Sequence, residues 1–190
     1  MLKILICHPR IGGTFLQSDL AVVRGVQVLS GVRVDWHSAL SRPVVSPRFA
    51  VLISPADPLD IRVSVARGFR PPQVFDEDLH LSSVGGEVRL IQLDPNLREE
   101  RATNVMAGLE WKPTAGRGQA LVELNAFHTR LTNLFHAIED DDPATSALEM
   151  RKTNVGGAQV YGVEANLGWG MGDDLVFQGG TVLQRAAMAT

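Results

Sequence analysis

Residues 158–169 read AQVYGVEANLGW, and from Tyr161 to Trp169 apolar side chains take the odd positions and polar residues or glycines the even ones. In a β-strand, successive side chains point to opposite faces of the sheet. One face of this strand would therefore be apolar and end in Trp169, whereas the other would carry Glu164 and Asn166. What each face contacts decides the class of fold.

The same period-two alternation recurs along the chain, whereas the spacing of amphipathic helices is scarce. It predicts strands near residues 14–23, 26–37, 48–54, 60–66, 103–112, 119–135, 158–169 and 174–185. In one of these segments the alternation changes phase at Phe127 and His128, which predicts a β-bulge there. The sequence thus predicts an all-β chain of about eight strands.

The links between these segments are alternately short and long. The short ones are Arg24-Gly25 and the stretches SPADPLD (54–60), KPTAGRG (112–118) and GMGDD (170–174). In an up-and-down antiparallel sheet every second link lies at the same end, so one end has tight turns and the other has long loops. Outer-membrane β-barrels show this asymmetry.

Strand length fits the same interpretation. A strand of about 10 residues that tilts by about 45° rises roughly 23 Å along the membrane normal, which matches the apolar band of such barrels. We therefore predict an antiparallel up-and-down transmembrane β-barrel segment, folded as an open curved sheet. Its apolar side chains would contact lipid, and its polar side chains would line a water-filled lumen.

Charged residues fall on the polar phase of these strands. A lipid-facing Arg or Lys at the middle of the bilayer costs about 2–4 kcal/mol, so this placement agrees with the membrane interpretation. The lumen-facing candidates are Arg33, Asp35, Arg62, Glu110, Glu164 and Asn166. The alternative for each of them is the wetted face of a soluble antiparallel sheet, which shows the same alternation.

Composition and sequence motifs argue against several classes of function. The chain has 190 residues, a net charge of -3 and one cysteine, Cys7, which argues against nucleic-acid binding and excludes an intramolecular disulfide. No apolar run reaches the roughly 18 residues of a membrane-spanning helix, and MLKILIC is shorter than a signal-peptide core. Hydrolase motifs are missing, and the stretches VGGEV (84–88) and NVGGA (154–158) lack the Lys-Ser/Thr of a phosphate loop. We expect no enzyme activity, no cofactor and no metal site.

Several stretches together resemble the β-barrel domain of TonB-dependent outer-membrane receptors. They are GVQVLSGVRVDWHS (25–38), SPRFAVLISPADPLDIRVSVARGFRPP (46–72), DPNLREERATNVMAGLEW (94–111), AFHTRLTNLF (126–135) and NVGGAQVYGVEANLGW (154–169). The set follows the order of the family's motifs along the chain. In addition, RPPQVFDEDLH (70–80) resembles receptors grouped with those for vitamin B12, ferric siderophores and colicins.

The resemblance implies a receptor of the Gram-negative cell outer membrane that imports a scarce solute, such as a ferric siderophore or a cobalamin-like molecule. The family's barrel has about twenty-two strands around a plug domain. We expect residues 14–187 to form part of such a barrel, with residues 1–13 unassigned and no plug. The expected partners are outer-membrane lipid, the plug domain, TonB and a small metal chelate or cobalamin-like ligand. The isolated piece would have two unpaired edges and is expected to aggregate.

The long link over residues 70–100 is where a ligand would meet this part of the barrel. Its candidates for ligand contact are Arg70, Asp76, Glu77, Asp78 and His80. Carboxylates bind Ca²⁺, but their spacing here is not that of an EF-hand, which favours an acidic rim over a metal site.

Two other interpretations compete with the receptor. A small closed eight-stranded outer-membrane barrel with a structural or adhesive role would be expected to have a C-terminal aromatic residue and a signal peptide. A soluble β-sandwich that binds a partner would instead pack the odd-numbered face of residues 161–169 against a second sheet.

Overall fold

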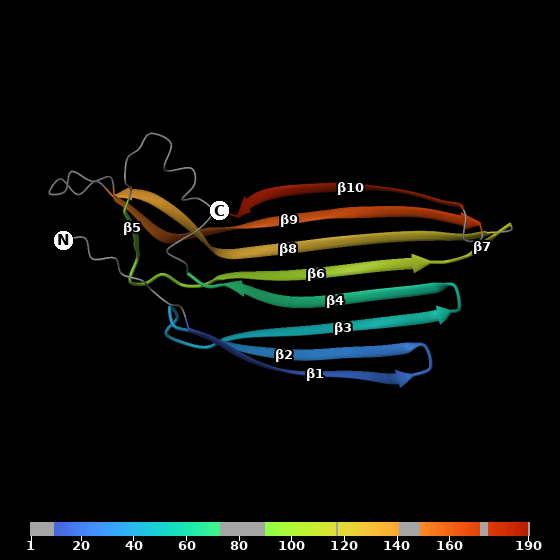
Figure 1. The fold of residues 1–190 in the computed structure, drawn as a ribbon, viewed down its shortest axis with the longest axis horizontal. Helices are drawn as coiled ribbons and strands as arrows, with labels where there is room; N and C mark the ends of the chain where they lie inside the picture. The colour runs from blue at the N-terminus through green and yellow to red at the C-terminus, as the bar shows by residue number, and fades with distance from the viewer. Residues whose placement is uncertain (1–9, 73–89, 117, 141–148, 172–174, 190) are drawn as a thin grey trace.

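The computed structural model describes residues 10–72, 90–116, 118–140, 149–171 and 175–189 (Figure 1). This part of the chain forms β-strands and no helix, so it contains no helix that could cross a membrane. The strands are β1 (Ile11–Val23), β2 (Val26–His37), β3 (Val44–Ala56), β4 (Leu59–Arg70), β5 (Leu90–Leu93), β6 (Glu100–Trp111), β7 (Thr114–Ala115), β8 (Gly118–Asp140), β9 (Glu149–Met171) and β10 (Leu175–Ala189).

The long strands form one antiparallel sheet in the order β1-β2-β3-β4-β6-β8-β9-β10. Strands that follow one another in this path pair side by side, which confirms the predicted up-and-down arrangement. The first strand begins at Ile11, inside the stretch that the sequence leaves unassigned. The short strand β7 pairs with the start of β8, and β5 pairs in parallel with β9, a contact that the alternation does not predict.

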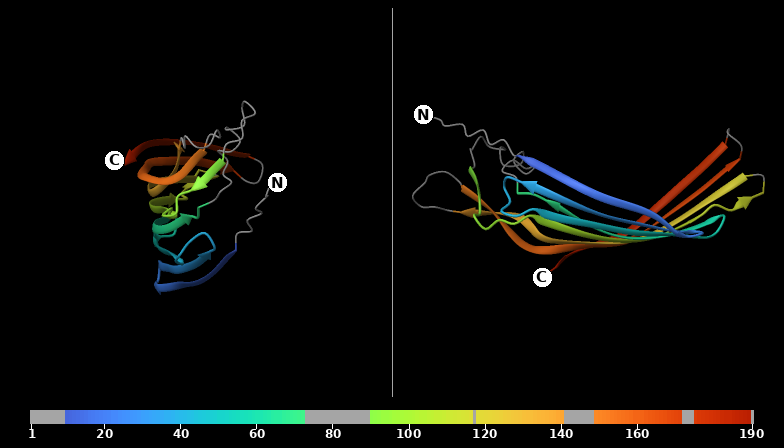
Figure 2. Two further views of the ribbon diagram at one scale, coloured as in Figure 1. Left: turned by 90° about the vertical axis from the view of Figure 1, so that its left-hand side faces the viewer. Right: turned by 90° about the horizontal axis from the view of Figure 1, so that it is seen from below.

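The sheet is a single curved layer. Figure 2 shows no second sheet or helix over either face of the described strands. Val163 and Leu167 are 52% and 60% exposed, and Val44, at 2%, is the one buried hydrophobic residue in the described part of the chain. A β-sandwich would bury one face of the sheet under a second sheet, so the described strands do not form one.

The sheet is also open. Its edge strands β1 and β10 each pair with one neighbour and not with each other. Every residue of β1 is exposed. The described strands therefore do not close into a small barrel, and they have the form expected of part of a barrel wall.

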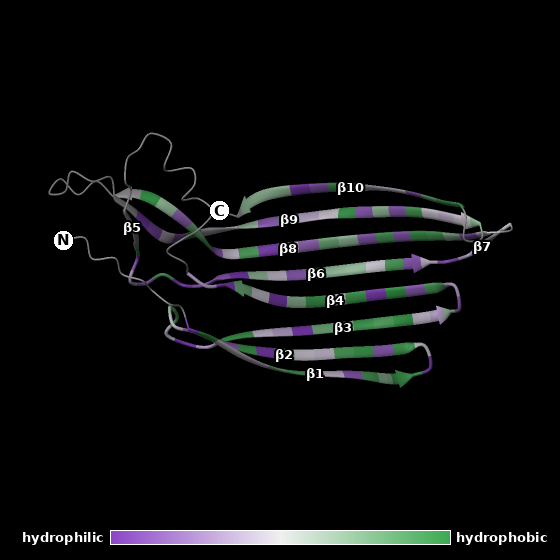
Figure 3. Ribbon diagram, viewed as in Figure 1, coloured by the Kyte–Doolittle hydropathy of each residue, from purple (hydrophilic) through white to green (hydrophobic). Residues whose placement is uncertain are grey.

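Strand pairing sorts the side chains into two faces, because residues that lie opposite each other on neighbouring strands share a face. One row across the sheet consists of Leu52, Arg62, Gly108, Asn125 and Glu164. The adjacent row consists of Val51, Val63, Ala107, Ala126 and Val163. We call the face of Glu164 the polar face and the face of Val163 the apolar face. Figure 3 shows the resulting alternation of hydropathy along the strands.

The predicted bulge at Phe127 and His128 is wrong. Strand β8 pairs with β6 and β9 through both residues without a shift of register. The change of phase instead places the Phe127 ring on the polar face and His128 on the apolar face. A Cβ atom at Gly162 would lie 2.9 Å from Cζ of Phe127, so the glycine leaves room for this ring.

The two ends of the sheet differ. At the turn end, which contains the β1–β2 and β3–β4 turns, Gly25 has a φ of 77° and its carbonyl accepts a 2.7 Å hydrogen bond from the Ser54 amide. At the opposite loop end, β8 and β9 continue well past the segments predicted for them, to 23 residues each. Short β5 joins the sheet there, beside the start of β9.

Candidate functional site

The six residues predicted to face a lumen all lie on the polar face. Arg62 shares its row with Glu164, and the next polar row toward the turn end contains Asp60, Glu110, Glu123 and Asn166. Arg33 and Asp35 lie on β2 at the loop end of the same face, because Gln27 of that strand pairs with Leu52 of the Arg62 row. The strands thus bring the six together on one face, at two different heights.

Arg33 and Asp35 form a compact ion pair near the loop end. The Arg33 Nε lies 2.9 and 2.8 Å from the two Asp35 carboxylate oxygens, and Nη2 lies 2.7 Å from Oδ1. Asp35 is only 4% exposed. Its strand partner is Gly13, where a Cβ atom would lie 2.5 Å from Asp35 Oδ1. The glycine therefore makes room for the Asp35 carboxylate.

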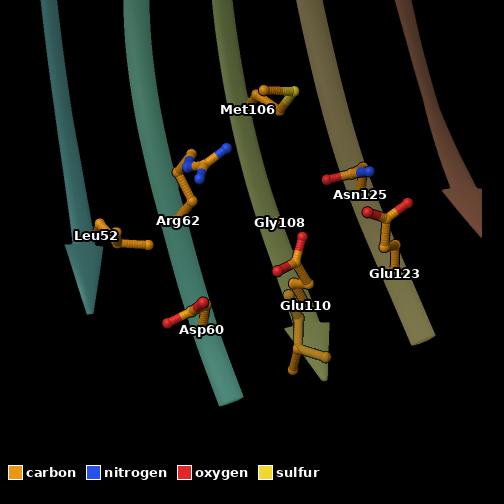
Figure 4. Close-up of a pocket in the computed structure, with 9 residues that line it drawn as sticks. Leu52, Asp60, Arg62, Met106, Gly108, Glu110, Glu123 and Asn125 are labelled. Carbon is orange, nitrogen blue, oxygen red and sulfur yellow. The ribbon is translucent and has the colours of Figure 1, made fainter. Parts of the chain in front are cut away.

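A second group surrounds a hollow of about 220 Å³ on the polar face (Figure 4). It is lined by Leu52, Asp60, Arg62, Met106, Gly108, Leu109, Glu110, Glu123 and Asn125. Asn125 lies over Gly108, where a Cβ atom would be 2.5 Å from its Oδ1. The hollow thus exists because a glycine lies opposite a polar side chain on the neighbouring strand.

Three carboxylates, Asp60, Glu110 and Glu123, line the hollow, and Glu164 lies in the adjacent row of Arg62. We call Asp60, Glu110, Glu123 and Glu164 the acidic ledge. Glu110 and Glu164 are predicted candidates, whereas Asp60 and Glu123 are not. The alternation assigns a face to each residue but does not show that Asp60 and Glu123 are the direct strand partners of Glu110. Arg62 is the one cation that lines the hollow.

Hydrogen bonds hold parts of the acidic ledge in place. Asn166 donates from Nδ2 to Glu164 Oε1 at 2.8 Å and to Glu123 Oε2 at 3.4 Å. Ser54 donates from its hydroxyl to Asp60. The ledge is therefore a positioned array of carboxylate oxygens that could receive cationic side chains from a partner domain.

Lys112 follows the end of β6, at the turn end of the ledge. Its ammonium forms an ion pair with Glu110. The hydrogen bond and the charge of Glu110 raise the pKa of Lys112 above its ordinary value, with smaller contributions from the charges of Asp60 and Glu123. The turn end of the polar face thus has a negative potential that attracts cations.

Arg70, predicted as a ligand contact, is held at the loop end by a neighbouring strand. Its Nε lies 2.8 Å from Glu100 Oε2, and its Nη2 lies 3.1 Å from Oε1. Its guanidinium also lies 5.1 Å from the centre of the Phe135 ring, as does the ammonium of Lys152, which is 6% exposed. Glu100 further accepts a 2.6 Å hydrogen bond from the Phe135 amide.

Asn154 anchors the segment that precedes β6. Its Oδ1 accepts from the Arg98 amide at 2.7 Å, and its Nδ2 donates to the Arg98 and Asn133 carbonyls at 3.0 and 2.8 Å. Asn133 has a φ of 56° and donates from Nδ2 to the Glu99 carbonyl at 3.3 Å. The sequence shows Asn154 in a family motif, but only the fold reveals which segment it binds.

The remaining loop candidates, Asp76, Glu77, Asp78 and His80, lie outside the described residues. Among the residues that the structure describes, no three His, Cys, Asp or Glu side chains form a group that could hold a metal ion.

Comparisons with known proteins agree with this geometry. The family model described as TonB dependent receptor-like, beta-barrel matches residues 10–186. A search of curated protein sequences found no match.

Solved structures share the fold at low sequence identity. The siderophore receptor PirA from Pseudomonas aeruginosa superposes with a TM-score of 0.73 at 18% identity, over 94% of this chain and 32% of that one. The FrpB iron transporter from Neisseria meningitidis gives 0.72 at 16% identity, over 95% and 26%. The ferric enterobactin receptor PfeA from Pseudomonas aeruginosa gives 0.70 at 17%, over 93% and 27%. This chain thus spans about a third or less of these proteins.

Proposed function

The chain belongs to the TonB-dependent receptor β-barrel family, and on this premise we propose that it forms part of the wall of an outer-membrane receptor that imports a ferric siderophore. The observation that carries the proposal is the single-layer sheet, whose apolar face is exposed along its whole width.

Membrane lipid is the proposed contact of the apolar face. Val63, Leu124 and Val163 are 47%, 49% and 52% exposed in the middle of that face. A continuous apolar surface of this size is unfavourable in water and requires an apolar cover. Because the strands pair in one layer with no second protein layer on them, hydrocarbon tails fit this need.

The polar face is the proposed lining of the lumen. Glu110, Glu123, Glu164 and Asn166 are half-buried although no second layer covers them. Side chains on the inner side of a curved sheet converge and shield one another, which supports placing the polar face inside. The acidic ledge would there bind basic side chains of the plug domain, and TonB would act on that plug.

The class of ligand comes from the relatives. PirA is described as a siderophore receptor, FrpB as an iron transporter and PfeA as a receptor for ferric enterobactin. A ferric siderophore is therefore the first ligand to test for the receptor that contains this chain, with a cobalamin-like molecule as the second.

Uptake by the full-length receptor tests this proposal. Cells that lack other receptors would express it, and import of radiolabelled iron on a catecholate siderophore would be compared with import of labelled cobalamin. We expect iron import alone. Import of cobalamin alone would make a cobalamin-like molecule the ligand in place of the siderophore. If neither is imported while the receptor is present in the outer membrane at its normal level, the proposal is contradicted for both ligands.

Charge reversal tests the role of the acidic ledge in the same cells. The double variant Glu110→Lys/Glu123→Lys should lose most iron import while its level in the outer membrane stays normal. Asp19→Lys is the matched control, because Asp19 lies on the polar face of β1, far from the ledge. Equal import by both variants would contradict a plug contact at the ledge.

A further inference from the structure

Four arginines lie on the apolar face, at its loop-end border. Arg67 and Arg130 share one row with Thr103 between them, on β4, β6 and β8. Arg101 lies in the next apolar row toward the loop end, opposite Thr132, and Arg185 lies in the row of Tyr161 and His128 on the other side. All four are exposed. We call Arg67, Arg101, Arg130 and Arg185 the arginine belt.

The positive charge of the arginine belt is largely uncompensated. Arg101 pairs with Glu99 at 2.5 Å. Arg67, Arg130 and Arg185 have no hydrogen bond or ion pair with any residue that the structure describes. Between the rows of Gly157 and Trp169, the apolar face of the described strands carries no carboxylate. Nothing described on this face neutralises the three guanidinium groups.

The opposite border of the apolar face has a different composition. Trp111 and Trp169 lie at the turn end, and Trp169 stacks on Phe177 with ring centres 6.2 Å apart. The rows of Leu167 and Trp169 carry no charged side chain on this face in the described strands. Aromatic side chains lie at both borders, because Tyr161 pairs with Arg185 and Phe69 pairs with Arg101 at the loop end. In the described strands charged side chains lie only at the loop-end border of this face, which indicates two different surroundings.

The geometry points to phosphate-bearing lipid headgroups as the partner of the arginine belt. This inference rests on the proposed membrane position, because only then does the border of the apolar face coincide with the headgroup layer. Arginine side chains extend their apolar stems along such a surface and place the charge at its edge. Planar guanidinium groups bind phosphate oxygens in a bidentate manner and more strongly when the site is partly shielded from water.

The spacing of the belt suits a headgroup with more than one phosphate. Arg67 and Arg130 are two strands apart, and strands lie about 4.8 Å from each other, so their Cα atoms are roughly 10 Å apart. Their flexible side chains, together with Arg101 between them, can reach two phosphates on one headgroup. Free phosphate can contact one or two of these arginines at a time and should bind much more weakly.

A lipid titration of the full-length receptor in neutral detergent tests the inference. Three ligands would be titrated separately: a lipid whose headgroup carries two phosphomonoesters, the enzymatically dephosphorylated form of that lipid, and inorganic phosphate. Native mass spectrometry would count the molecules of each that bind. We expect saturable binding of the phosphorylated lipid only. Arg67→Gln/Arg130→Gln should weaken it at least tenfold. Arg48→Gln is the control, because Arg48 is exposed at a similar height on the polar face, and it should bind like the parent.

Several outcomes would overturn the inference. They are equal binding of the dephosphorylated lipid, equal competition by inorganic phosphate, an equal loss in Arg48→Gln, and retention of an acidic protein by the belt in place of lipid. A nitroxide label at residue 163 separates this failure from failure of the proposed function. If the label reports lipid while the belt variants bind normally, only the inference about the belt is wrong.

Discussion

The two faces of this sheet are built from the same strands, yet neighbouring residues on one strand meet opposite surroundings. Arg62 faces a hollow lined by carboxylates, whereas Val63, the next residue, lies in a continuous apolar surface. A β-strand has a side-chain period of two, so a shift of one residue exchanges the faces. In a single-layer sheet each face contacts a solvent of its own, and the side chains on that face must suit it. Both faces therefore constrain the sequence.

The largest expected effect comes from placing a charge on the apolar face. Val63→Arg should destabilise the full-length receptor in lipid by about 2–4 kcal/mol, because the guanidinium would lie in hydrocarbon. Ser64→Arg is the matched control on the same strand and should change stability by less than about 1 kcal/mol, since Ser64 lies on the polar face, the proposed lining of the lumen. Urea unfolding in lipid vesicles measures both. Equal losses would show that the faces do not differ in solvent.

A methyl group on the polar face should have the next largest effect. At Gly162 an added Cβ would contact the Leu183 carbonyl oxygen and lie 2.9 Å from Cζ of Phe127, whereas at Gly179 it would meet nothing within 4 Å. Gly162→Ala should therefore cost about 1–3 kcal/mol in the same unfolding measurement. Gly179 pairs with Leu167 on the apolar face, so Gly179→Ala is the uncrowded control. If it costs as much, crowding on the polar face is not the cause.

A smaller effect is expected at the loop end, where Asn154 binds the segment before β6. Asn154→Ala removes three hydrogen bonds, two of them exposed to water, and should cost about 1–2 kcal/mol and make residues 94–100 easier to cleave by protease. Asn96→Ala is the control, because the described hydrogen bonds of Asn96 use its backbone amide. Equal cleavage of both variants would argue against an anchoring role for Asn154.

The smallest effect concerns Lys112 at the turn end. Its pKa is raised by Glu110, so its contribution to stability is complete below the ordinary lysine pKa and disappears as the pH rises through the higher folded value. Glu110→Gln should return the pKa of Lys112 toward normal, as NMR of the side-chain nitrogen would measure. No shift in that pKa would mean that the ion pair does not persist in solution.

The sequence predicts the two faces well because every long strand of the single-layer sheet alternates apolar and polar side chains, as the proposed contact with lipid on one side and water on the other requires. It predicts the lengths of β8 and β9 poorly, since both strands continue at the loop end past the residues that alternate. In the proposed membrane position these extensions would lie beyond the apolar band, where no alternation is required. The parallel contact of β5 with β9 escapes prediction for a similar reason: it depends on a long link that returns to the sheet.

Where the sequence mispredicts or misses a particular residue, the reason is a neighbour on another strand. Phe127 appears as a break in alternation because its own strand does not show that Gly162 opposite leaves room for a ring on the polar face. Asp60 and Glu123 are overlooked because alternation within a strand does not show which residues lie opposite Glu110. Register between strands is thus the information that the pattern lacks.

Nitroxide accessibility at two adjacent positions tests most directly whether the faces meet lipid and water. Val163→Cys and Glu164→Cys, each made in a Cys7→Ser background, would be spin-labelled in the full-length receptor in lipid vesicles. The label at 163 should collide with dissolved oxygen, which concentrates in hydrocarbon, and the label at 164 with a water-soluble nickel chelate. The reverse result, or the same preference at both positions, would contradict the assignment of the apolar face to lipid and the polar face to water.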